Sequence, residues 1–203
     1  MKTLLVTYLP SGQYSKTKKL LDAFLSEIKD SQIEAIDLLN AKIPTFNLDS
    51  IPAYYKRNYQ NLPLNSKEAN LLSENDRLVK QLKSCDILVM AYPMHNFGMP
   101  ALVKAYLDAV ILNGETFEMG KKMMAGKKSL TLFTSGGTYN TELVNLEYPN
   151  WDTLTMLAKI NFGFMGFDQS EVIGTSLRDP ASEAEKLSQA VIKIKDIVKK
   201  WYV

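Results

Sequence analysis

Short apolar runs alternate with amphipathic stretches along most of the chain. The apolar runs predict five buried strands, within residues 4–9, 33–38, 87–91, 129–133 and 166–175. The other stretches repeat apolar residues every three to four positions, which predicts helices at residues 16–29, 66–83, 101–110, 151–161 and from 179 onward. This alternation is typical of a doubly wound α/β fold, a five-stranded parallel sheet with helices on both faces.

Residues 40–64 interrupt the alternation. They contain Pro44, Pro52 and Pro63 and four aromatic residues, without a clear period. This pattern predicts a long irregular excursion, of the kind that often carries function. Because the sequence has no interdomain linker or internal repeat, we expect residues 1–203 to form a single domain.

Composition excludes several classes of protein. The 203 residues carry 24 Lys and Arg against 22 Asp and Glu, so no basic excess supports nucleic-acid binding. With one cysteine, Cys85, and one histidine, His95, the chain can form no internal disulfide, cysteine-cluster site or multi-histidine metal site. The longest apolar stretch, residues 87–94, is far below the ~20 residues of a membrane span. The N-terminus does not read as a signal peptide, so we expect a soluble, cytoplasmic protein.

The loops after the first, third and fourth strands carry unusual chemistry. Ligands of doubly wound sheets bind at the carboxyl ends of the strands, where these loops lie. In the first loop, Ser11, Ser15 and Thr17 place hydroxyls at a helix start, which favours an anion such as a phosphate monoester. The alternative is that Ser15 only caps the helix and residues 11–12 only form a turn.

The second and third loops suit a flat ring. Pro93 and Pro100 stiffen the second loop, and Met94, Phe97 and Met99 can border a ring. Alternatively, the loop is a connector with Phe97 and Met99 in the core. In the third loop, residues 134–139, two adjacent glycines let backbone N–H groups converge on a partial negative charge; alternatively, it is a tight turn. The chain has no G-x-G-x-x-G motif, Walker A motif or G-x-S-x-G elbow, which disfavours a dinucleotide fold, a P-loop NTPase and a serine hydrolase.

Several segments together match a known family. The strongest is PMHNFGMP at residues 93–100, and the others are KAYLD at 104–108, GETF at 114–117, GKK at 126–128, SGGTY at 135–139 and GFMG at 163–166. In order and spacing over nearly the whole chain, the sequence resembles the FMN-dependent NADH-azoreductases, flavodoxin-like relatives of the NAD(P)H:quinone reductases.

The resemblance implies a homodimer with one bound FMN per subunit near the interface. It implies ping-pong, two-electron (hydride) reduction of quinones and azo compounds, with NADH or NADPH as co-substrate. The FMN phosphate would be held by Ser15, Lys16 and Thr17. The isoalloxazine ring would be bordered by Pro93, Met94, His95, Asn96 and Phe97. Its pyrimidine edge would contact Thr134, Ser135, Gly136 and Gly137. Possible substrate contacts are His95, Phe117, Tyr139 and Phe164.

Two departures from the family pattern leave points open. Many members have a serine at the end of the first strand, so here a phosphate contact is either missing or moved to Ser11. Many also have an arginine before the glycine pair, where this chain has Ser135, which leaves flavin potential and nucleotide preference undecided. We expect residues 40–64 to form part of a substrate cover. The alternative function is an FMN electron-transfer protein without a small-molecule substrate of its own.

Overall fold

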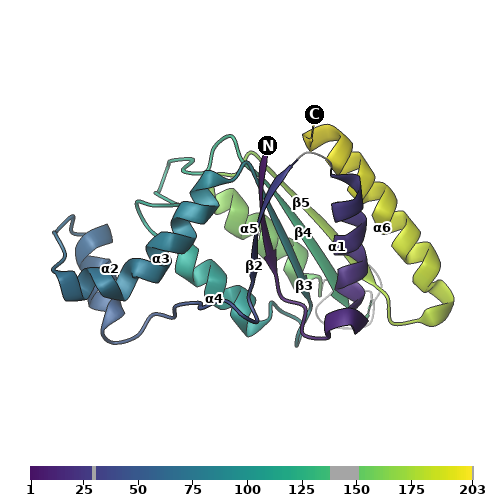
Figure 1. The fold of residues 1–203 in the computed structure, drawn as a ribbon, viewed down its shortest axis with the longest axis horizontal. Helices are drawn as coiled ribbons and strands as arrows, with labels where there is room; N and C mark the ends of the chain where they lie inside the picture. Colours follow the sequence, from purple (N-terminus) through teal and green to yellow (C-terminus); the bar gives the residue numbers. More distant parts are fainter. Residues whose placement is uncertain (29–30, 138–150, 203) are drawn as a thin grey trace.

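A five-stranded parallel sheet organises the molecule (Figure 1). The computed structural model describes residues 1–28, 31–137 and 151–202. The strand order is β2-β1-β3-β4-β5, which confirms the predicted doubly wound α/β fold. The strands are β1 (Lys2–Thr7), β2 (Gln32–Asp37), β3 (Ile87–Pro93), β4 (Lys128–Ser135) and β5 (Gln169–Ser176).

Helices cover both faces of this sheet. They are η1 (Gly12–Tyr14), α1 (Lys16–Glu27), α2 (Ser50–Asn58), α3 (Ser66–Ser84), α4 (Ala101–Val110), α5 (Thr153–Met165) and α6 (Pro180–Trp201). Helices α1 and α6 pack on one face, and α3, α4 and α5 on the other (Figure 1). Across the described residues, no helix is both long and apolar enough to span a membrane.

Strand β3 lies at the centre of the sheet, and its sequence explains why. Because side chains alternate along a strand, Leu88 and Met90 enter the core beneath α3–α5, while Val89 and Ala91 enter the core beneath α1 and α6. Burial of each large side chain contributes about 1.5–3 kcal/mol. A strand that buries both faces reads as a continuous apolar run, as residues 87–92 do.

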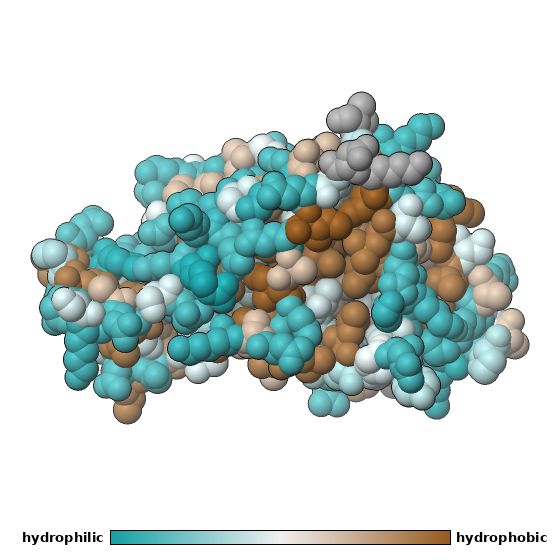
Figure 2. All heavy atoms as spheres, viewed as in Figure 1, coloured by the Kyte–Doolittle hydropathy of each residue, from teal (hydrophilic) through white to brown (hydrophobic). Residues whose placement is uncertain are grey.

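Strand β2 forms an edge of the sheet and is less covered. Ile33 is 43% exposed, and Figure 2 shows apolar side chains gathered on this face of the molecule, between α3 and α1. Glu34 on the same strand pairs with Lys2 and accepts a hydrogen bond from Gln81. Lys2 in particular holds the pKa of the Glu34 carboxyl below its usual value. A charged side chain on an edge strand opposes pairing with another sheet.

Residues 40–64 differ from the sequence prediction, because they contain helix α2. Only Ser50 and Ala53 of this helix are buried, so its apolar residues show little helical period. Pro52 stands in the first turn, where a backbone N–H has no helical partner to lose. Helix α2 packs on α3 at one end of the molecule (Figure 1), and Arg57 pairs there with Asp76. Its role as a substrate cover stays a prediction.

The chain between α5 and β5 turns at Gly166. This residue has φ +86° and closes the C-terminal end of α5 in the left-handed conformation. A Cβ there would lie 2.5 Å from the Cα of Lys122. Gly166 therefore caps α5, and the fifth strand expected within residues 166–175 follows it as β5, which begins at Gln169.

Candidate functional site

The three loops singled out in the sequence meet at the carboxyl edge of the sheet. The hydroxyls of Thr17 and Thr134 are 2.7 Å apart, which joins the start of α1 to the end of β4. The backbone N–H of Met94 donates to the carbonyl of Thr134 at 2.8 Å, which joins the second loop to the third. The rings of Tyr8 and His95 meet edge to face, with centroids 5.6 Å apart. The ends of β1, β3 and β4 thus form one surface.

In the first loop, the hydroxyls of Ser15 and Thr17 already have structural roles. Ser15 is buried and caps α1 by accepting a hydrogen bond from the N–H of Lys18 at 3.3 Å, as the alternative interpretation expected. Such a hydroxyl still has its own O–H to donate to an anion. Thr17 is fully buried against Thr134, whereas Ser11 is exposed.

Lys16 follows this cap and forms an ion pair with Glu183 of α6, which also pairs with Lys19. These pairs tie the starts of α1 and α6 together. Hydrogen bonds from Lys16 and then Lys19 hold the pKa of the Glu183 carboxyl below its usual value. Lys16 therefore places a positive charge at the start of α1, and the Glu183 carboxylate neutralises part of it.

The second loop has a strained backbone. His95 and Gly98 exchange backbone hydrogen bonds of 3.0 and 2.9 Å, which closes a tight turn. Inside it, Asn96 and Phe97 have φ of +48° and +61°, a left-handed conformation that is uncommon outside glycine and clusters at functional sites.

The side chain of Phe97 lies at the surface of this loop. It is 48% exposed, so the alternative is wrong for this ring, whereas Met99 of the same loop is partly buried against the core. Its ring meets Trp151 edge to face at 4.8 Å, and its carbonyl accepts a hydrogen bond from Thr153. These contacts fix an exposed aromatic ring beside Asn96 and His95, which are also exposed.

The third loop leaves backbone accessible. The hydroxyl of Ser135 donates to the carbonyl of Gly137 at 2.6 Å, and Gly136 is exposed. A Cβ on Gly136 would have no heavy atom within 4 Å, so this position faces open space. Tyr139, a predicted substrate contact, lies outside the described residues.

Phe117 and Phe164, the other predicted substrate contacts, lie together. Their ring centroids are 4.7 Å apart and the rings are tilted by 36°. Phe164 belongs to α5 and is 47% exposed, in line with Met156 at 54% and Ile160 at 57%. Because these three residues are four positions apart, they form an exposed apolar stripe along one face of α5.

Among the other described residues, burial keeps several reactive side chains protonated. Burial raises the pKa of the Cys85 thiol to about 11, which disfavours the nucleophilic thiolate at neutral pH. Burial also raises the pKa of Tyr54 to about 12 and keeps the Tyr92 phenol protonated by raising its pKa. Among residues 1–28, 31–137 and 151–202, no three His, Cys, Asp or Glu side chains gather as a metal site requires.

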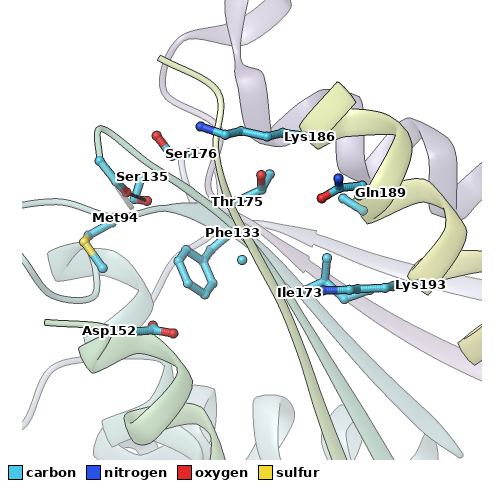
Figure 3. A pocket seen from close by; sticks show the side chains of 13 residues that line it. Met94, Phe133, Ser135, Asp152, Ile173, Thr175, Ser176, Lys186, Gln189 and Lys193 are labelled. Carbon is cyan, nitrogen blue, oxygen red and sulfur yellow. Dashed lines mark hydrogen bonds between the residues drawn. The ribbon is translucent and has the colours of Figure 1, made fainter. Parts of the chain in front are cut away.

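A cavity that the sequence did not indicate lies beside the third loop. It has a volume of about 210 Å³ and extends from Met94 and Ser135 to the side chains of α6 (Figure 3). Lys186, Gln189 and Lys193 line it from α6. Their spacing of three and four residues places them on one face of α6. The sequence shows this spacing, but it does not show that this face lines a cavity, because that depends on how α6 packs beside β5.

Comparison with known proteins places this arrangement in a family. A model for proteins with a flavodoxin-like fold matches residues 1–198. The chain belongs to this flavodoxin-like family. Within it, the FMN-dependent NADH:quinone oxidoreductase of Shewanella loihica is 30% identical over 195 residues, which cover 92% of this chain and 93% of that protein.

Solved structures agree with the flavodoxin-like assignment. An azoreductase from Bacillus anthracis strain Sterne has a TM-score of 0.82 at 23% identity, covering 98% of this chain and 99% of that one. An FMN-dependent NADH-azoreductase from B. anthracis strain Ames Ancestor, solved in complex with FMN, has a TM-score of 0.78 at 23% identity, with the same coverage. The predicted resemblance to FMN-dependent NADH:quinone oxidoreductases and azoreductases is confirmed.

Proposed function

We propose that this chain is an FMN-dependent oxidoreductase that uses NADH or NADPH to reduce quinones and azo compounds. The observation that carries the proposal is the convergence of the three loops, joined by the Thr17–Thr134 and Met94–Thr134 contacts. The FMN dependence of the flavodoxin-like relatives supports the choice of cofactor.

The residues at this edge fit FMN. The start of α1 carries the partial positive charge of a helix N-terminus, which suits a phosphate. Ser11, Ser15 and Lys16 supply polar side chains there, and Thr17, whose hydroxyl is buried against Thr134, would contribute its backbone N–H. The exposed turn around Asn96 and Phe97 and the open space at Gly136 leave two backbone segments accessible to a flat ring.

Bound FMN would supply the two-electron exchange between a nicotinamide and an acceptor. The protein's part is to hold the ring and favour its reduced, more negative state. Backbone N–H groups of Ser135, Gly136 and Gly137 would act as preorganised dipoles at the pyrimidine edge. The Asn96 amide would orient that edge by hydrogen bonding, while Met94 and Phe97 border the ring and exclude water.

We further propose that the active form is a homodimer that uses the apolar stripe of α5. Met156, Ile160 and Phe164 are each about half exposed, although they are large and apolar. Contiguous apolar surface of this kind commonly marks a protein interface. A second copy packed here would bring additional aromatic surface to Phe117 and Phe164, where we expect the acceptor to bind.

The test is NADH oxidation by purified protein supplied with FMN, with 2-methyl-1,4-naphthoquinone as acceptor and no protein partner. We expect sustained turnover that requires FMN and the quinone together. An absence of turnover with quinone and azo acceptors alike would contradict the proposal. If electrons then passed only to an added redox protein, the chain would be an electron carrier.

A further inference from the structure

The turn formed by residues 95–98 in the second loop holds Phe97 in a conformation that this residue does not favour on its own. Phe97 has φ +61°, and Asn96 before it has φ +48°. Gly and Asn tolerate this left-handed region, whereas a bulky aromatic residue there is an outlier. Such a backbone persists only where the surrounding structure holds it. The protein must therefore supply contacts that hold Phe97.

The hydrogen bonds that close the 95–98 turn lie on either side of Phe97. Two of them join the backbones of His95 and Gly98, at 3.0 and 2.9 Å. A third ties the N–H of Met94 to the carbonyl of Thr134. None of these three bonds uses the N–H or the carbonyl of Phe97. The contacts that hold Phe97 itself therefore come from elsewhere in the chain.

Two residues at the start of α5 contact Phe97, one through its backbone and the other through its ring. The hydroxyl of Thr153, the first residue of the helix, donates to the carbonyl of Phe97. The ring of Trp151, two residues earlier, meets the Phe97 ring edge to face, with the centroids 4.8 Å apart and the planes at 83°. Together the two contacts fix both the peptide group and the side chain of Phe97.

The start of α5 is itself well anchored. The carboxylate of Asp152 caps the helix by accepting a hydrogen bond from the N–H of Thr155 at 3.1 Å. Leu154 and Ala158 on the same helix are fully buried in the core. A group held by a packed helix is placed more precisely than one held by a loop. The start of α5 is therefore suited to fix the conformation of the 95–98 turn.

We propose that Thr153 and Trp151 are positioning residues, which hold the 95–98 turn in the conformation that binds the flavin ring. A turn already in this conformation spares the ligand the free energy of ordering it. Without the two contacts, Phe97 returns to negative φ in part of the molecules, and only the remaining fraction binds the ring. This inference rests on the proposed function for the ligand, but not for the conformation of the turn.

The first test measures the turn in flavin-free protein, where the backbone NMR chemical shifts of Phe97 report its φ. We expect left-handed shifts in the wild type and shifts averaged toward the ordinary region in Thr153→Val. Thr153→Ser keeps the hydroxyl and should restore the wild-type shifts. The control is Thr155→Val, the same change in the same helix turn, at a hydroxyl without a hydrogen bond among the described residues. Wild-type shifts in Thr153→Val, or equal changes in Thr155→Val, would overturn the proposal.

The same measurement tests the ring of Trp151. Its indole N–H is buried and has no hydrogen-bond partner in the described structure, so we expect the ring, and not this donor, to matter. Trp151→Phe keeps an aromatic ring against Phe97 and should keep the wild-type shifts, whereas Trp151→Leu should change them. Equal changes in the two variants would overturn the role of the ring contact.

The second test titrates the flavin-free variants with FMN and with riboflavin. We expect Thr153→Val to bind FMN roughly fivefold more weakly, the factor that one lost hydrogen bond typically costs. Riboflavin should weaken by the same factor, because in the proposed site the turn borders the ring and not the phosphate. Unchanged FMN affinity, or a loss for FMN alone, would overturn the proposal. If the wild-type protein binds neither flavin, the proposed function fails, while the NMR comparison still decides whether α5 holds the turn.

Discussion

The hydrogen bond between Thr17 and Thr134 offers the sharpest test of how the site is built. Thr17 is fully buried and Thr134 is 7% exposed, so neither hydroxyl can exchange its partner for water. In Thr17→Val, the Thr134 hydroxyl keeps its buried position and loses its partner at 2.7 Å. Leaving a buried polar group unsatisfied costs about 1–3 kcal/mol, and for a chain of this size each kcal/mol lowers Tm by about 2–4 °C.

The measurement is urea unfolding of Thr17→Val, Thr134→Val and the double variant. We expect each single variant to lose about 1–3 kcal/mol, and the double variant to lose clearly less than their sum. FMN affinity should fall in the single variants as well, because the bond aligns the first and third loops. The control is Thr131→Val, whose buried hydroxyl on the same strand β4 has no hydrogen-bond partner in the described structure. That variant should be neutral or stabilising, since it removes an unsatisfied group. Additive losses, or a Thr17→Val variant as stable as wild type, would refute the reasoning.

Three further predictions address the end of α5, the ion pairs of Glu183 and the stripe on α5. Gly166→Ala should destabilise the protein by about 1–3 kcal/mol, because residue 166 has a left-handed φ and its new Cβ would contact Lys122. Gly163→Ala, which lies in open space within α5, should instead stabilise the protein by up to about 1 kcal/mol. Thermal unfolding that ranks the two variants the other way would contradict this account. The pKa of Glu183 is lower in the folded protein, so its ion pairs stabilise the fold above the ordinary pKa of 4.5, and this stabilisation is lost as pH falls below that value. Glu183→Gln should therefore be less stable than wild type at pH 7 and should lose less stability on acidification. Parallel stability–pH profiles for the variant and the wild type would refute the pairing. Ile160→Glu should convert the proposed dimer to monomer in analytical ultracentrifugation. Ile192→Glu, a control on α6 with a similarly exposed side chain (58%), should not. Equal behaviour of the two variants would show that α5 is not in the interface.

The sequence predicted the sheet well because its strands are buried on both faces. The apolar run at residues 87–92 is typical of a strand buried on both faces, as at the centre of a parallel sheet. Helix α2 was missed because its apolar side chains are mostly exposed, so burial imposes no period on them. The fifth strand was found within the predicted range 166–175, but an apolar run does not reveal that its first residue, Gly166, caps the preceding helix.

The candidate site was predictable in part for a topological reason. Parallel strands bring their carboxyl ends to one edge, so three distant loops could be expected to meet. The roles of Ser15 as a cap and Thr17 as a partner of Thr134 depend on contacts that spacing does not specify. The lysine-lined cavity could not be predicted, because it depends on how α6 is rotated against β5.

The most direct test of the central claim is titration of flavin-free protein with FMN and with riboflavin, followed by flavin fluorescence. If the start of α1 holds a phosphate and the second and third loops hold the ring, FMN binds at one equivalent per chain. Riboflavin, which lacks the phosphate, then binds at least about tenfold more weakly. No saturable FMN binding, or equal binding of the two flavins, would contradict the account.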